Sequence, residues 1–116
     1  MNYTEYLKKK MLLLADEVNA GTGGNIKFNQ QKVTKENMSF SGANGRIWIQ
    51  PFHGQYDICL SGQSIEKQMY GFMCNICGKD NDGYKQTKPE PHAPFWRVSD
   101  FKLVEKATYY YAKTRK

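Results

Sequence analysis

Apolar and polar residues alternate with two different periods along this chain. The first segment has helical spacing, with apolar residues at intervals of four, three and four: Leu7, Met11, Leu14 and Val18. These positions share one face of a helix, which we expect to begin near Thr4 and to end near Gly21. A second helical stripe predicts a C-terminal helix capped by Ser99 or Asp100, with one face made of Phe101, Val104, Ala107 and Tyr111.

Between these helices the period changes to two, which is typical of strands with one buried face. We expect strands over residues 26–28, 38–40, 46–50, 55–60 and 95–98, and a further one over 67–73 that Gly71 interrupts. In the 46–50 strand, Ile47 and Ile49 should face one side and Trp48 the other. Asn44-Gly45 predicts a tight hairpin turn.

This order of elements predicts an α+β fold. It has an N-terminal helix, a four- to five-stranded antiparallel meander and a C-terminal helix. With 116 residues the chain is expected to form a single compact domain over 1–116. Glycines and prolines interrupt residues 78–94, which we expect to be a long irregular loop. Ordered loops of this length are often functional.

Composition narrows the class of protein. Apolar residues make up 40% and charged residues 24% of the chain, a globular balance. No apolar run approaches the roughly 18 residues that a membrane span needs, so no membrane association is expected. The run Met11–Ala15 stops at Asp16, too short for an export signal. Three cysteines are too few for a disulfide scaffold, and we expect a cytoplasmic protein with free thiols.

Cys74 and Cys77 form the sharpest local motif, because Cys-x2-Cys followed by Gly78 is typical of half a zinc site. His92 would be the third ligand, with His53 or Cys59 as a fourth. The alternative is that both cysteines are ordinary thiols at the end of a strand and that the protein holds no cofactor. A redox role like that of thioredoxin is disfavoured, because no βαβ pattern surrounds the pair.

Basic residues are interleaved with aromatic ones, and together they could combine phosphate contacts with base stacking. The formal net charge is 17 − 11 = +6, which favours polyanionic partners. Three tyrosines in a row cannot all face inward on a helix, so Tyr109 or Tyr110 should be exposed. The candidate contact residues are Arg46, Trp48, Tyr84, Lys85, Arg97, Tyr109, Tyr110, Lys113, Arg115 and Lys116.

Three functions remain open from the sequence. The first is a small basic binding protein without enzymatic activity, acting on nucleic acid or on a protein complex that handles nucleic acid. The second is an inhibitor or adaptor of the phage or mobile-element type, binding a host protein. The third is a small enzyme that depends on cysteine or metal. Steep salt dependence in a gel shift would favour the first, because phosphate contacts release counterions.

The C-terminal tail generates the first testable prediction. Lys113, Arg115 and Lys116 lie close together at a chain end, where they can reach a partner without disturbing the packing. Reversing all three charges should abolish partner binding, while each surface substitution changes the free energy of unfolding by no more than about 0.5 kcal/mol. Pull-down and thermal unfolding measure the two effects, and unchanged binding would place the interface elsewhere.

Overall fold

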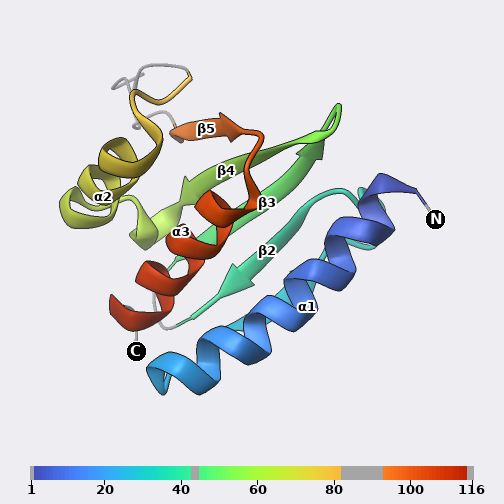
Figure 1. Cartoon of the computed structure of the whole chain (residues 1–116), viewed down its shortest axis with the longest axis horizontal. Coiled ribbons are helices and arrows are strands. Elements are labelled where there is room, and N and C mark those ends of the chain that lie inside the picture. The colour runs from blue at the N-terminus through green and yellow to red at the C-terminus, as the bar shows by residue number, and fades with distance from the viewer. Residues whose placement is uncertain (1, 43–44, 82–92, 115–116) are drawn as a thin grey trace.

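A single antiparallel sheet organises the molecule (Figure 1). The computed structural model describes residues 2–42, 45–81 and 93–114. Its elements are α1 (Tyr3–Thr22), β1 (Lys27–Gln30), β2 (Met38–Ser41), β3 (Arg46–Phe52), β4 (Gln55–Ser61), the 3₁₀ turn η1 (Gly62–Ser64), α2 (Lys67–Cys77), β5 (Phe95–Val98) and α3 (Phe101–Thr114). The strands lie in the order β1-β2-β3-β4-β5, and each neighbouring pair is antiparallel. The predicted α+β fold, with its two terminal helices and its meander, is confirmed.

The longest pairing in the sheet is the β3–β4 hairpin. It pairs seven residues of each strand, from Arg46 opposite Ser61 to Phe52 opposite Gln55. His53 and Gly54 make the connection with φ of 45° and 80°. Positive φ at both positions is the requirement of the two-residue turn whose twist matches that of the flanking strands. The hairpin therefore has a fixed register.

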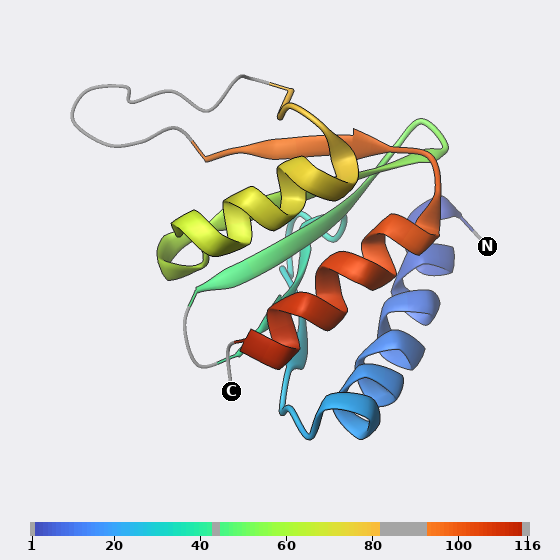
Figure 2. The same ribbon diagram turned by 60° about the vertical axis from the view of Figure 1, so that its left-hand side comes forward.

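All three helices lie on one side of the sheet (Figures 1 and 2), so the fold has two layers. The sheet side of the core consists of alternate strand residues, which are buried beneath the helices as the period of two predicts: Met38, Phe40, Ile47, Ile49, Tyr56, Ile58, Leu60, Trp96 and Val98. In the described residues no helix covers the other side of the sheet, which we call the open face.

Helix α1 is slightly displaced along the chain from its prediction. Asn2 is the N-cap, and its side-chain oxygen accepts a hydrogen bond of 2.8 Å from the backbone N–H of Glu5. Gly23, in the left-handed conformation with φ 70°, ends the helix two residues later than expected. The predicted stripe is buried as expected: Leu7, Met11, Leu14 and Val18.

The predicted strand over 67–73 is wrong, because Lys67–Cys77 is helix α2. Glu66 caps this helix, and its carboxylate accepts hydrogen bonds from the backbone N–H groups of Gln68 and Met69. Met69 and Met73, four residues apart, are fully buried on one face. Gly71 is on the exposed side of the helix, and a Cβ added there would meet no neighbouring atom, so packing does not require glycine at this position. A short apolar stretch with one glycine does not distinguish the two periods.

Helix α3 begins at the predicted cap, where the Asp100 carboxylate accepts a hydrogen bond of 2.9 Å from the backbone N–H of Lys102. The Tyr111 hydroxyl is on the buried face and donates a hydrogen bond of 2.8 Å to the carbonyl of Gly45. Gly45 has φ 70°, and a Cβ there would overlap the backbone nitrogen of Ser64. This position therefore requires glycine. Residues 43 and 44 lie outside the described part of the predicted turn.

Leu14 and Leu13 allow a direct test of this packing. Leu14 is 4% exposed in the core, whereas Leu13 beside it is 64% exposed. Leu14→Ala should lower the free energy of unfolding by about 2–5 kcal/mol, because it leaves a cavity between α1 and the sheet. Leu13→Ala is the matched control and should change it by no more than about 0.5 kcal/mol. Equal effects in chemical denaturation would contradict the placement of α1.

Candidate functional site

The register places a row of side chains across the middle of the open face. Residues directly opposite one another in neighbouring strands point to the same side of a sheet. The central row therefore reads Asn29, Ser39, Trp48, Cys59 and Phe95 across the five strands. Next to it on one side lie Ser41, Arg46 and Ser61, and on the other side lie Gln50, Asp57 and Arg97. Three of the predicted contact residues (Arg46, Trp48 and Arg97) thus share one surface.

Trp48 is held in one orientation on this surface. Its indole N–H donates a hydrogen bond of 2.7 Å to the hydroxyl of Ser61 on β4. The exposed guanidinium of Arg46 lies 5.7 Å from the centre of the indole ring, within range of a cation–π interaction. Arg46 also reaches the hydroxyl of Ser39 at 3.4 Å. A fixed aromatic ring and an exposed cation therefore lie side by side.

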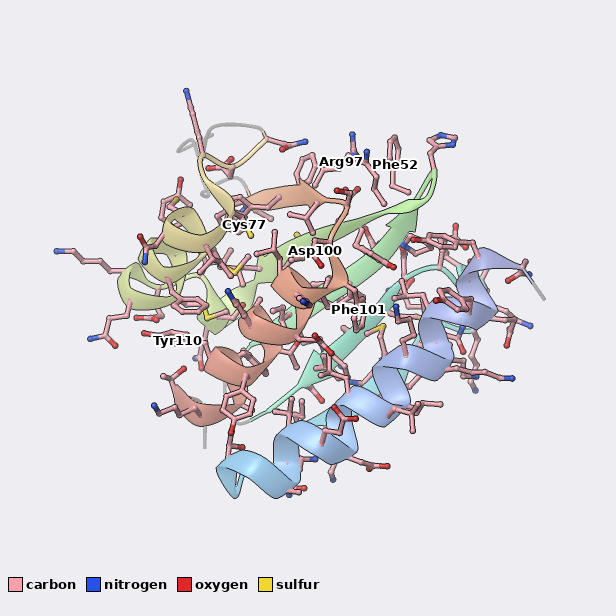
Figure 3. All side chains as sticks on the ribbon, viewed as in Figure 1. Phe52, Cys77, Arg97, Asp100, Phe101 and Tyr110 are labelled. Atoms are coloured by element: carbon pink, nitrogen blue, oxygen red, sulfur yellow. The ribbon has the colours of Figure 1, made fainter. Side chains whose placement is uncertain are left out.

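Arg97 is engaged much more tightly with its neighbours. It makes a two-pronged ion pair with Asp57, with N–O distances of 2.8 and 2.9 Å. Its guanidinium carbon lies 3.5 Å from the centre of the Phe52 ring. Figure 3 shows both side chains near the turn end of the β3–β4 hairpin. The hydrogen bonds that Arg97 donates to the Asp57 carboxylate raise the pKa of Arg97 above its usual value. Arg97 therefore contributes a cationic, stacked platform whose charge Asp57 balances.

The predicted contact residues on α3 lie on the other side of the molecule and serve helix packing. The Tyr110 ring stacks on Phe72 of α2, with centres 4.0 Å apart and planes 6° from parallel. Tyr109 is 44% exposed, as expected for one of the tyrosines, and its hydroxyl donates to the carbonyl of Gly21 at 3.1 Å. Lys113 is exposed near the end of the helix. Tyr84, Lys85, Arg115 and Lys116 lie outside the described residues.

Cys74 and Cys77 lie in the last turn of α2 and not at the end of a strand. Both thiols are half-buried, and burial raises the pKa of Cys77 to about 11. Cys77 is therefore a neutral thiol near pH 7. Within residues 2–42, 45–81 and 93–114, no three His, Cys, Asp or Glu side chains gather as a metal site would require. His92 lies outside these ranges, so the three-ligand zinc hypothesis stays a prediction.

Close to these cysteines, Asp80 is 3% exposed and accepts a hydrogen bond of 2.6 Å from the Tyr70 hydroxyl. That hydrogen bond raises the pKa of Tyr70 well above its usual value. Trp96 bonds through its indole N–H to the carbonyl of Gly78 at 2.8 Å. Asp80 and Gly78 are thereby held against the end of α2 and the sheet, so this polar cluster fixes the chain where it leaves the helix.

Sequence reasoning missed several members of the open face. Phe52 and Phe95 are not among the contact residues predicted from the sequence, and the sequence connects neither Gln50 nor Asp57 with Trp48 or Arg97. Alternation within the 55–60 strand could have placed Asp57 on the side opposite Ile58. The register between β4 and β5 was needed to show that Asp57 faces Arg97.

The chain is thus a two-layer α+β protein, and none of its described helices covers the sheet face that carries these aromatic and basic side chains. No known protein family, curated protein or solved structure matches it. No helix in the described parts of the chain combines the length and the apolar character that crossing a membrane requires.

The half-buried thiol of Cys77 generates a prediction on reactivity. The thiolate is the nucleophile, and with a pKa of about 11 only about 0.1% of Cys77 is thiolate at pH 8. Its alkylation by iodoacetamide at pH 8 should be at least about tenfold slower in the folded protein than in urea, and should accelerate as the pH rises. Peptide mass spectrometry measures both rates. Equal rates would show that Cys77 is not buried as described.

Proposed function

We propose that this chain binds single-stranded nucleic acid on the open face of its sheet, as a non-enzymatic protein of the cytoplasm. The observation that supports it most directly is the position of Trp48. This fixed ring lies beside the exposed cation of Arg46, on a face that none of the described helices covers. Aromatic side chains on an open sheet stack unpaired bases in one of the common RNA-binding modules.

The spacing of the aromatic rings favours a single strand over a duplex. Trp48 and Phe95 lie in the same row with Cys59 between them, so they are two strand spacings apart, or about 9–10 Å. Two such rings can each stack on a base of an extended strand. Bases inside a duplex are already stacked on one another, so their faces are not available to Trp48 and Phe95. The ligand that uses these rings is therefore unpaired.

The charge on this surface suits a phosphate backbone. Lys27 and Arg46 are both exposed on the open face, and the chain as a whole carries a net charge of +6. Arg97 adds a third cation, balanced by Asp57. Exposed cations beside stacking rings give binding that tolerates many sequences and weakens with salt, by about 0.7 log units per phosphate contact for each tenfold rise in salt.

Trp48→Leu tests this proposal directly. The loss of one stacking platform should cost about 1–3 kcal/mol, which raises Kd for a fluorescein-labelled dT decamer by about 5- to 150-fold in an anisotropy titration. Tyr109→Leu removes an exposed aromatic ring from α3 and is the matched control, so its Kd should equal that of the wild type.

Tryptophan fluorescence gives an independent readout of the same surface. Trp96 is 1% exposed beneath the helices, so quenching by bound bases should come from Trp48 alone. Quenching that disappears in Trp48→Leu supports the open face. If Tyr109→Leu weakens binding and Trp48→Leu does not, the interface lies on α3 instead.

A further inference from the structure

A hollow beside Trp48 gives the open face a second, more selective feature. It has a volume of about 300 Å³ and is lined by Gln31, Asn37, Trp48, Gln50 and Cys59. This volume is at the lower end for ligand sites, and the hollow opens to solvent at the surface of the sheet. It therefore suits one flat group of a longer ligand better than a whole enclosed molecule.

One wall of the hollow is aromatic. Trp48 and Cys59 are opposite one another in the β3–β4 register, so the indole and the thiol lie next to each other on the same face. The hydrogen bond from the indole N–H to Ser61 prevents the ring from turning. A planar ring that enters the hollow meets a flat partner of fixed orientation, as stacking requires.

The other wall is a chain of three side-chain amides. The Gln50 amide nitrogen donates to the Asn37 amide oxygen at 2.7 Å, and the Asn37 amide nitrogen donates to the Gln31 amide oxygen at 3.0 Å. A backbone hydrogen bond of 3.1 Å from Gln31 to the carbonyl of Asn37 closes the loop that carries two of these amides. The amides are therefore positioned before any ligand arrives.

This chain of amides keeps hydrogen-bonding capacity for a ligand. A primary amide has two N–H donors and one oxygen that accepts two bonds. Within this chain of amides, Gln50 donates one N–H and Gln31 uses only its oxygen. The amide groups of Gln31 and Gln50, at its two ends, therefore have further N–H donors. Gln50 also has its oxygen. If the oxygen and nitrogen positions of all three amides were exchanged, the ends would still offer both N–H donors and an oxygen acceptor to a ligand. The hollow thus presents donors and acceptors beside an aromatic ring.

We infer that this hollow binds one unpaired nucleobase, with the base stacked on Trp48 and its edge hydrogen-bonded by Gln50. The inference rests on the proposed binding of single-stranded nucleic acid, and it adds discrimination between bases at one position. A base is a planar ring whose edge carries adjacent donors and acceptors, and Gln and Asn amides pair with such edges in two-pronged fashion. Arg46, beside the indole, contacts the adjoining phosphate.

Three variants separate base reading from phosphate contact. Kd is measured by anisotropy for labelled dA, dC and dT decamers at three salt concentrations. Gln50→Leu should raise Kd for the most tightly bound decamer by about tenfold and reduce the differences in Kd among the three decamers. The salt slope should not change. Arg46→Gln should weaken all three equally and reduce the salt slope by about 0.7. Gln55→Leu makes the matched substitution outside the hollow and should behave like the wild type.

The outcomes distinguish this inference from the function on which it depends. If the wild type binds the decamers and Gln50→Leu retains both their affinities and their ranking, the hollow does not read a base, while the proposed function stands. If the wild type binds no decamer, the proposed function fails and the inference fails with it. Equal thermal midpoints for Gln50→Leu and Gln55→Leu ensure that a change in ranking reflects the site and not the fold.

Discussion

The register of the β3–β4 hairpin is the constraint on which the rest of the structure depends. Seven consecutive pairs join these strands, and the His53-Gly54 turn fixes their alignment. Because successive side chains point to opposite faces, this one register sends Ile47 and Ile58 toward the helices and Trp48 toward solvent. A slip of one residue would exchange the two faces and expose the core. Both β2 and β5 continue the alternation outward from this pair.

The helices on a single side give the two faces different roles. The covered face packs against α1, α2 and α3, and its side chains are almost completely buried. The open face is held by directional contacts instead: the ion pair of Arg97 with Asp57, the bond from Trp48 to Ser61 and the chain of amides that ends at Gln50. Such contacts order side chains and still leave rings and polar groups available at the surface. Packing on the covered face thus stabilises the fold, while the open face presents side chains in fixed positions.

Aromatic residues divide between these roles in a way that depends on their surroundings. Tyr110 stacks on Phe72, and Tyr109 bonds to the end of α1, so both tyrosines join helices to one another. Phe52 lies against the guanidinium of Arg97 and is 38% exposed. Trp48 combines a fixed ring with a neighbouring exposed cation. The aromatic surface best suited to a ligand is thus on the sheet, although the sequence has its densest run of tyrosines on α3.

The sequence by itself determined what depends on local periodicity: both terminal helices, the antiparallel meander, the burial of Leu14 and Ile47, and the outward direction of Trp48. It could not determine α2, because an eleven-residue segment with apolar residues at most positions and a glycine near its middle does not separate the two periods. Only the tertiary structure decided that Arg97 and Asp57, 40 residues apart, form an ion pair, and that Gln50 meets Asn37 beside Trp48. Spacing along one strand shows which face a side chain takes, whereas the pairing between strands decides which residues become neighbours on that face.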